Sequence, residues 1–395
     1  MNTKRLFINF TLCLILYYLS LATVIGFATV FLQSKAISNT LIGLIFSCSS
    51  IFCILSQSIY SSFLDQYLKL STKLFLIGTS IITIVSIVIL MNTNKTWLIF
   101  LCYVSLYTVM LLNSSLFSSF AMEFINSGTP LNYSLSRGLG SFFYAGGTFI
   151  VGFLVNRFQI SCIFPLCLGF QIILLVAYIF IKPADRTKTA SLRISNKKEQ
   201  AEGLPVFLMH NPNLLFLLIS ILFIYISYSS INNFQINILN TVGGGSKELG
   251  ISSAIGAALE LPAMALFLPL SRRISFEKIL KISCFFFFAK VVCFSLATSV
   301  LQVYLAQCLQ FASYGLFIPA STYYVNSILS DLDKTKGQSA LGIFTFGLGG
   351  LIASLLSGTM LDHFSVHALL TIESVLALIG LIGVMIASNK LKKAR

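Results

Sequence analysis

The sequence predicts an all-α polytopic membrane protein with twelve transmembrane helices in two six-helix halves. Three observations lead to this prediction: 56% of the 395 residues are hydrophobic, only 10% are charged, and the apolar residues gather in long runs. A soluble domain carries ~25% charged residues, so this chain has too few to cover a surface that faces water. The alternating ~10-residue strands of a transmembrane β-barrel are not visible in the sequence.

Long apolar runs define the expected spans, since a helix needs ~20 mostly apolar residues to cross the hydrocarbon core of a bilayer. The first run is too long for the apolar part of a cleaved signal peptide, and we therefore expect it to be retained as a span. The twelve expected spans are 6–32, 40–64, 73–91, 96–122, 137–156, 161–181, 213–238, 249–270, 279–299, 300–329, 338–361 and 367–389.

The positive charges alternate between the loops. Of the 26 Lys and Arg residues, 20 fall in the loops and ends on one side of the expected spans, and 4 fall on the other side. Positively charged loops stay in the cytoplasm. We therefore expect both termini to be cytoplasmic in a multi-pass protein of the plasma membrane.

A long polar segment after the sixth expected span divides the chain. It contains six Lys and Arg residues, and we interpret it as a solvated linker. We expect a first six-helix bundle over 1–181, a cytoplasmic linker over 182–212, a second bundle over 213–389 and a basic cytoplasmic tail over 390–395.

The composition also argues against several functions. The net charge of +14 is explained by membrane orientation, so we expect no nucleic-acid partner. Most of the nine cysteines lie inside apolar runs, where burial explains them. Two of the three histidines lie outside the expected spans, and His367 is the first residue of the last one. We therefore expect no metal, no cofactor and no enzymatic activity, and a monomer in the lipid bilayer.

Two charges stand at or inside apolar segments at the middle of the first half. Glu123 directly follows the fourth expected span, and Arg137 opens the Gly-rich fifth one after a Ser-Gly-Thr-Pro turn at 127–130. An ionisable group in a membrane span costs at least ~2.5–3.5 kcal/mol unless it is paired or hydrated. We therefore interpret the pair as part of a functional site, although a charged pair that orients the loop at the interface would also explain it.

Short basic turns follow the second and the eighth expected spans. The first reads SSFLDQYLKLSTK with Asp65, and the second reads PLSRRISFEKILK. Two six-span halves with such turns resemble the major facilitator superfamily, whose substrate site lies near mid-bilayer between the halves. By this resemblance, Asp65 is the acid that caps a helix and acts as a latch, which means that it stabilises the outward-facing conformation. The glycines of the family motif are not kept, because serine replaces the first and the second is absent.

The segment NYSLSRGLGSFFYAGG, over 132–147, resembles the start of the fifth helix in the oligosaccharide:proton symporter branch, to which lactose permease belongs. By this resemblance Arg137 and Tyr144 contact the solute, and the aromatic ring stacks on a sugar. Seven residues separate them, so they share one helix face. Glu123 resembles the acid that pairs with this arginine.

The second half resembles helices eight to ten of the same branch, and the segment FSLATS gives the clearest match. By this alignment Lys290 stands at an arginine, Gln310 at a histidine, and Ser313 at the carboxylate that carries the proton. We expect Gln310 to bind the solute, because its amide can donate and accept hydrogen bonds with a hydroxyl-rich ligand. Glu260 lies one turn after the position of the eighth-helix acid. A carboxyl in a low-dielectric surrounding can bind and release a proton near neutral pH. Glu260 is therefore the expected proton carrier, and nearby Lys290 would favour its ionised form.

Further polar residues lie in other expected spans. Asn233 belongs to an amide-rich stretch that could bind solute or hydrate the extracellular mouth of the pathway. Tyr17 and Tyr18 are weaker candidates for the site. Glu373 and Asp362 lie near the expected extracellular ends of their spans, where we expect them at the membrane interface. The amide-rich stretch contains Asn232, Asn233, Gln235 and Asn237.

The function predicted from these residues is secondary active transport by alternating access. The expected solute is small, polar and organic, such as a sugar, an oligosaccharide or a nucleoside-like molecule, and proton-coupled symport is expected. The alternative is a major facilitator exporter of drugs or metabolites that works by proton antiport. Such an exporter more often has a Gly- and Pro-rich fifth span, and the fifth span here is Gly-rich without the proline.

Overall fold

A computed structural model describes residues 3–66, 71–182, 203–330 and 333–393. Within these ranges the side chains of 58, 61–66, 126, 134, 335 and 392–393 are not described. Asp65 falls in this group, so its expected role as a latch lies outside the described residues.

Every regular element in the described ranges is a helix. In the first half these are α1 (Thr3–Val24), α2 (Ala28–Ser34), α3 (Asn39–Gln66), α4 (Thr72–Asn92), α5 (Thr96–Asn126), α6 (Tyr133–Phe158), the short η1 (Ile160–Cys162) and α7 (Ile163–Ile179). In the second half they are α9 (Leu204–His210), α10 (Pro212–Thr241), α11 (Ser246–Ser271), α12 (Phe276–Leu296), α13 (Val300–Cys308), α14 (Tyr314–Ile328), α15 (Lys334–Gly342), η3 (Ile343–Gly349), α16 (Gly350–His363) and α17 (Val366–Lys393).

Eleven helical segments of the described chain are long and apolar enough to cross a membrane. The remaining expected span, 300–329, is interrupted between α13 and α14. Successive amides from Leu309 to Ala312 donate to carbonyls three residues earlier, which tightens the backbone and ends α13. The expected all-α membrane fold is thus confirmed, and its tenth span is a broken helix.

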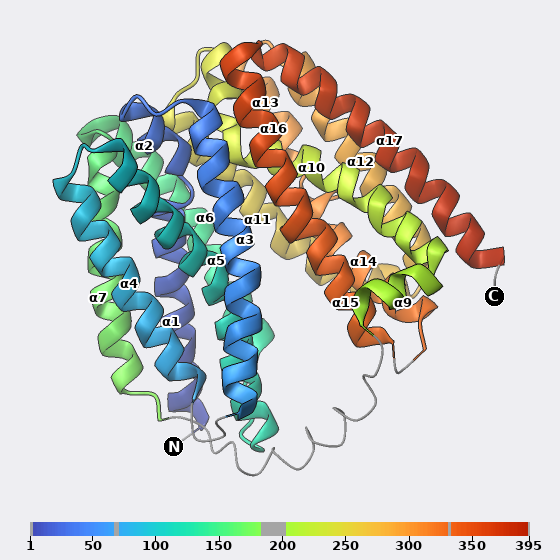
Figure 1. The fold of residues 1–395 in the computed structure, drawn as a ribbon, viewed down its shortest axis with the longest axis horizontal. Helices are drawn as coiled ribbons and strands as arrows, with labels where there is room; N and C mark the ends of the chain where they lie inside the picture. Colours follow the sequence, from blue (N-terminus) through green and yellow to red (C-terminus); the bar gives the residue numbers. More distant parts are fainter. Residues whose placement is uncertain (1–2, 67–70, 183–202, 331–332, 394–395) are drawn as a thin grey trace. The chain divides into compact units, whose positions relative to one another are not determined.

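The chain forms two compact units (Figure 1). The first consists of 1–37 and 48–199, and the second of 38–47 and 200–395. In the first unit α1 packs against α6 and α7, and α4 packs against α5 and α7. Buried tyrosines fix these helices to each other, because the Tyr17 hydroxyl donates to the Met110 carbonyl at 2.8 Å and the Tyr103 hydroxyl donates to the Val24 carbonyl at 2.9 Å.

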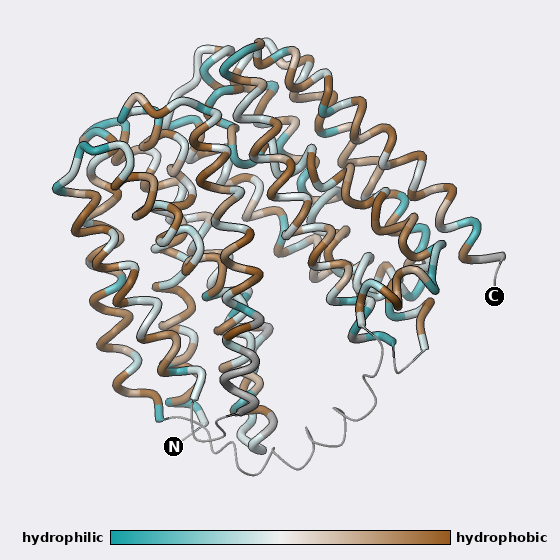
Figure 2. Tube along the Cα trace, in the orientation of Figure 1, coloured by the Kyte–Doolittle hydropathy of each residue, from teal (hydrophilic) through white to brown (hydrophobic). Residues whose placement is uncertain are grey.

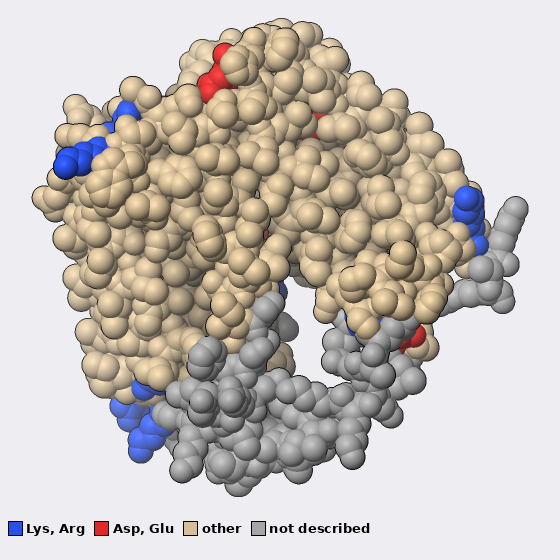
Figure 3. Space-filling model, in the orientation of Figure 1, with Lys and Arg blue, Asp and Glu red and all other residues tan. Residues whose placement is uncertain are grey.

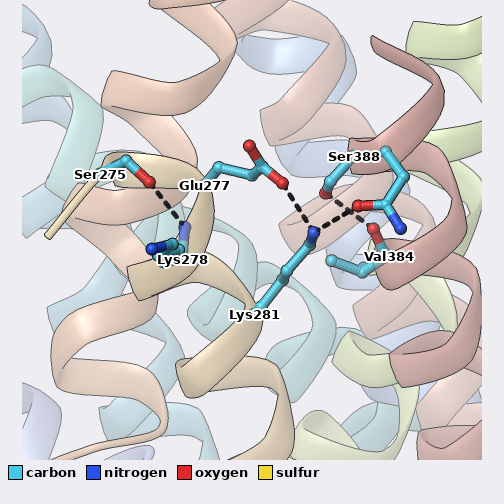
Figure 4. A network of polar contacts seen from close by, with 7 residues as sticks. Ser275, Glu277, Lys278, Lys281, Val384 and Ser388 are labelled. Carbon is cyan, nitrogen blue, oxygen red and sulfur yellow. Dashed lines mark hydrogen bonds and ion pairs between the residues drawn. The ribbon is translucent and has the colours of Figure 1, made fainter. Parts of the chain in front are cut away.

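In the second unit, α17 runs along α10 and α12 (Figure 1). Gly380 lets the backbones of α17 and α10 approach, because a Cβ at this position would lie 2.7 Å from the Ser220 carbonyl oxygen. At one end of α12 the Lys281 ammonium donates to Glu277 at 2.6 Å and to Asn389 of α17 at 2.8 Å (Figure 4). The pair α10–α17 is therefore held by close backbone packing, and α12 is fastened to α17 by a polar contact.

The first residues of α3 belong to the second unit. The carboxylate of Asp362, in α16, accepts from the backbone amides of Asn39 at 2.9 Å and Thr40 at 2.7 Å. Asp362 thereby caps the N-terminus of α3, where a negative charge is favourable. Next to this cap the helices touch closely, since a Cβ on Gly43 would meet the backbone of Ser354.

The outward-facing side chains are mostly apolar. Figure 2 shows apolar residues along most of each helix, and on the face seen in Figure 3 few side chains are charged. On α4, for example, Ile81, Val85 and Val88 are all exposed. Such a surface is costly in water and suits the acyl chains of a bilayer. The chain is a multi-pass membrane protein.

Candidate functional site

A chain of polar contacts crosses the interior of the second unit. The Lys290 ammonium of α12 donates to the Gln310 carbonyl oxygen at 2.6 Å. The Gln310 amide nitrogen in turn donates to the Glu260 carboxylate of α11 at 2.7 Å. The structure thus brings together the three residues that the sequence singled out in this half, and one amide side chain connects the acid to the base.

The basic end of this chain is buried. Lys290 and Gln310 are each 2% exposed, whereas Glu260 is half-buried. The ammonium lies 5.8 Å from the centre of the Tyr228 ring and 5.6 Å from that of Phe294. Aromatic faces attract a cation most strongly where water is excluded. Together the two rings and the amide oxygen stabilise a charge that would otherwise be costly in this position.

The break between α13 and α14 determines where Gln310 points. Gln310 lies in the tight turn that follows α13, and Gly315 near the start of α14 allows a close approach to α11. A Cβ on Gly315 would lie 2.5 Å from the Ala263 Cβ and 3.5 Å from the Glu260 Cα. A larger residue would therefore push α14 away from the helix that carries Glu260. Interrupted helices at binding sites are a known feature of membrane transporters.

Tyrosines border the polar chain, and reasoning from the sequence missed them. Tyr228 stacks on Tyr314 with ring centres 4.6 Å apart and an interplanar angle of 13°. Its hydroxyl lies 3.5 Å from the Gln310 amide nitrogen. Tyr225 also contacts Tyr228. The spacing of three residues within YISYSS places Tyr225 and Tyr228 on one side of α10, and this was the signal available in the sequence.

Ser313 stands where the resemblance places a proton-carrying carboxylate. It is fully buried, and its hydroxyl has no hydrogen-bond partner among the described residues. A serine hydroxyl does not gain or lose a proton near neutral pH, so this position cannot carry the proton as a carboxylate would. In this part of the second unit, Glu260 is the carboxyl that contacts Gln310.

In the first unit, Arg137 and Tyr144 lie on α6 beside Tyr18 of α1. Arg137 and Ser141 lie within hydrogen-bonding reach of the Tyr18 hydroxyl. The Tyr18 and Tyr144 rings meet edge to face, with centres 6.5 Å apart. Gly140 makes room for this arrangement, because a Cβ there would overlap the Tyr18 ring. Tyr18 thus joins the two expected residues into one cluster of a guanidinium and aromatic faces.

Glu123 of α5 contacts the start of α4. It is 6% exposed, and its carboxylate accepts from the Thr72 hydroxyl at 2.6 Å, the Thr72 amide at 3.2 Å and the Ser71 hydroxyl at 3.2 Å. These donors lie at the start of α4, where backbone amides need acceptors. Capping of α4 is sufficient to explain its burial, and a contact between Glu123 and solute stays a prediction.

The amides of α10 bond to neighbouring helices within the second unit. Asn233 donates to the Ser354 hydroxyl of α16 at 2.9 Å, and Gln235 donates to the Ser252 hydroxyl of α11 at 2.8 Å. Asn233 therefore lies beside α16, and a role in solute binding stays a prediction. Among the described residues, no group of three or more His, Cys, Asp or Glu side chains is placed to hold a metal ion.

The profile of the MFS_1 like family matches residues 7–371. The chain belongs to this family. It is 22% identical over 369 residues to the uncharacterized transporter YwbF of Bacillus subtilis (strain 168), and the match covers 92% of this chain and 88% of YwbF.

Solved structures of transporters have the same fold. A crystal structure of a mutant of the nucleoside transporter NupG matches with a TM-score of 0.82 at 12% identity, covering 98% of this chain and 100% of that one. A bacterial homolog of the human lysosomal transporter Spinster, in an inward-facing and unoccupied conformation, matches with a TM-score of 0.73 at 14% identity and covers 100% of this chain and 98% of its own. The expected superfamily is confirmed, and this protein is a membrane transporter of small molecules rather than an enzyme.

Proposed function

We propose that the protein is a proton-coupled symporter that moves a small polar ring-containing solute, a sugar or a nucleoside, across the plasma membrane by alternating access. The observation that carries this proposal is the contact chain Glu260–Gln310–Lys290 inside the second unit. A carboxyl linked to a buried ammonium through one amide has two protonation states that differ strongly in their interactions with their surroundings.

The geometry suggests how the proton is held and released. With Glu260 ionised, the Gln310 amide donates to the carboxylate, and the buried Lys290 ammonium stabilises the negative charge through that amide. With Glu260 protonated, the carboxyl is neutral and Gln310 still satisfies the ammonium. A motion that separates Gln310 from Glu260 therefore favours uptake of a proton from water, and restoring the contact favours its release.

The solute class is suggested by the chemistry of the side chains in each unit. Tyr18, Tyr144 and Arg137 in the first unit offer aromatic faces and a charged donor. Tyr228 and Tyr314 offer stacked rings in the second. Aromatic faces suit the planar or pyranose ring of a nucleoside or sugar, and amides and a guanidinium suit its hydroxyls. The fold likeness to NupG, a nucleoside transporter, agrees with this class.

Orientation follows from the charge distribution. Since 20 of the 26 Lys and Arg residues lie on one side of the expected spans, we propose that this side, with both termini, is cytoplasmic. An impermeant amine reagent applied to intact cells, followed by mass spectrometry of the purified protein, tests this with native lysines. Lys95 on the opposite side is expected to be labelled, whereas Lys4 and Lys390 are labelled only after the cells are opened. Labelling of Lys4 or Lys390 from outside would contradict the proposed orientation.

Transport is tested with purified protein in proteoliposomes. Radiolabelled sugars and nucleosides are offered with an inward proton gradient, and counterflow without a gradient is measured in parallel. The proposal predicts that at least one solute exchanges in counterflow and accumulates only when the proton gradient points inward. Accumulation driven by an outward gradient would instead indicate the antiport of an exporter. Counterflow without any gradient-driven accumulation would exclude proton coupling.

A further inference from the structure

A second acid lies inside the second unit. Glu373, on α17, is 0% exposed, so its side chain lies inside the protein. The reason is helix packing, because α17 packs along α10 and α12, and Ser230 of α10 reaches the carboxyl. This acid is not part of the Glu260–Gln310–Lys290 chain.

Of the two carboxyl oxygens of Glu373, Oε1 has a hydrogen-bond partner among the described residues and Oε2 has none. The Ser230 hydroxyl of α10 donates to Oε1 at 2.5 Å. The Ser227 hydroxyl, one turn earlier on α10, donates to the backbone carbonyl of Glu373 at 2.8 Å. Oε2 is buried and has no hydrogen-bond partner among the described residues. An ionised carboxylate normally accepts bonds at both oxygens, so this environment suits the neutral acid better.

The charged groups of the neighbouring helices are engaged elsewhere or exposed. Lys290 donates to Gln310, Lys281 contacts Glu277, and Asp362 caps α3. No ion pair joins Glu373 to any described residue. Four helices, α10, α12, α16 and α17, carry further ionisable groups. Among their described side chains these are Tyr225, Tyr228, Glu277, Lys278, Lys281, Cys284, Lys290, Cys293, Asp362, His363, His367 and Lys390. A buried carboxylate without a cation is unfavourable, and protonation removes the charge that makes it so.

The backbone of α10 is interrupted next to this carboxyl. Phe234, four residues after Ser230, has φ of −120° and ψ of 24°, which is outside the helical range. Such a break is a place where a helix can bend. A bend there would move Ser230 relative to α17 and change the access of water to Glu373.

The same turn of α10 also contacts the other polar chain. Tyr228, between Ser227 and Ser230, lies over Lys290 and near Gln310. A displacement of this turn therefore affects the surroundings of both acids, Glu260 and Glu373. It is a physical connection between them through one helix segment.

We propose that Glu373 is a second proton-binding site, which holds a proton while α10 and α17 are packed as in this structure and exchanges it with water when α10 bends at Phe234. The ligand is a proton, bound at the carboxyl whose Oε1 contacts Ser230. On release the neutral carboxyl becomes a carboxylate and the proton passes to water. Its part in coupling rests on the proposed transport function, whereas the proton site itself does not.

Infrared spectroscopy of the full-length protein in lipid tests the site directly, because the carbonyl band of a protonated carboxyl is separate from the bands of a carboxylate. At neutral pH the wild type is expected to show such a band, which shifts after transfer to deuterated water. Glu373→Gln loses the band, and Glu277→Gln, a change in a half-buried acid of α12 that is paired with Lys281, keeps it. Glu260→Gln identifies any share of the band that belongs to Glu260.

Two results would overturn the proposal. Identical carboxyl bands in the wild type and in Glu373→Gln would mean that Glu373 is ionised. A band that neither exchanges in deuterated water nor declines at alkaline pH would mean that the proton is permanent and structural. If Glu373→Gln does not fold, Ser230→Ala replaces it: loss of the bond to Oε1 must shift the band, and an unshifted band contradicts the assignment.

Transport assays separate this proposal from the function on which its coupling role rests. Glu373→Gln is expected to keep counterflow and to lose gradient-driven accumulation. Unchanged accumulation, together with loss of the infrared band, would remove Glu373 from coupling. A wild-type protein that transports no solute would overturn the proposed function, while the infrared result would still decide whether Glu373 binds an exchangeable proton.

Discussion

Glu123 in the first unit and Glu260 in the second are both acids within apolar segments, but the structure gives them different partners. Glu123 accepts three hydrogen bonds from Ser71 and Thr72 at the start of α4. Glu260 accepts from Gln310, whose other end holds the buried Lys290. The first arrangement stabilises one helix end, whereas the second connects three separate segments of the chain.

The difference shows which kind of buried charge can act as a switch. A capping carboxylate is most useful when it stays ionised and in place, because its partners are backbone amides and nearby hydroxyls. A carboxylate linked to a cation through one side chain changes its interactions if that side chain is displaced. Sequence position alone does not separate these two cases. Substitutions in both units can distinguish a capping carboxylate from one that acts as a switch.

The largest effect is expected for Gln310→Leu. This change keeps the side chain's size but removes both polar contacts, so the Lys290 ammonium is left buried without its acceptor. Leaving a buried charge uncompensated costs about 3 kcal/mol or more. A large fall in the thermal unfolding temperature in detergent is expected, and Gln302→Leu at the exposed start of α13 serves as the control. Equal stability of the two variants would contradict the inference that the contacts between Glu260, Gln310 and Lys290 stabilise the fold.

A smaller effect is expected for Gly140→Ala in the first unit. The added Cβ would overlap the Tyr18 ring and push it away from Arg137 and Tyr144. Overpacking of this kind costs about 1–3 kcal/mol, and we expect it to weaken solute binding as well. The matched control is Gly146→Ala on the same helix, where a Cβ meets open space. If both variants bound solute as the wild type does, the proposal that Tyr18, Arg137 and Tyr144 bind solute would be contradicted.

Glu123→Gln is expected to be milder and purely structural. Glutamine keeps the shape of the side chain but loses the negative charge at the N-terminus of α4. A lost cap interaction costs about 1 kcal/mol, so unfolding should occur at a slightly lower temperature while solute affinity stays the same. A thermal-shift titration with a transported solute measures both quantities. A large drop in affinity would instead support the contact with solute that the sequence suggested.

The smallest effect is expected for Glu277→Gln near one end of α12. Glu277 contacts Lys281 at 2.6 Å, and Lys281 also holds Asn389 of α17 (Figure 4). Pairs at this spacing on a helix stabilise by less than about 0.5 kcal/mol. The unfolding temperature and transport should both match the wild type within error. A substantial loss of stability would show that this contact fastens α12 to α17 more strongly than we infer.

Much of the fold could be predicted because hydropathy and helix length are local properties. The apolar runs and the alternation of positive loops require no knowledge of tertiary contacts. The break inside 300–329 was missed, because its tight turn depends on packing between α14 and α11 at Gly315 rather than on a proline or a polar interruption. Hydropathy averages over such a turn.

The site could be predicted only in part. Glu260, Lys290 and Gln310 were found because charges and amides are rare in apolar spans. Tyr228 was missed because tyrosine is common in this chain, with 15 copies, and its position carries no signal by itself. The burial of Glu373 was not predicted, because it depends on the packing of α17 along α10 and α12, which the distance from a span end does not reveal.

The central claim is that Glu260 carries the coupling proton through its contact with Gln310 and Lys290. The most direct test compares Glu260→Gln with the wild type in proteoliposomes, using one transported solute, in counterflow and under an inward proton gradient. The account predicts that counterflow persists in the variant while gradient-driven accumulation is lost. Full gradient-driven accumulation by Glu260→Gln would contradict it.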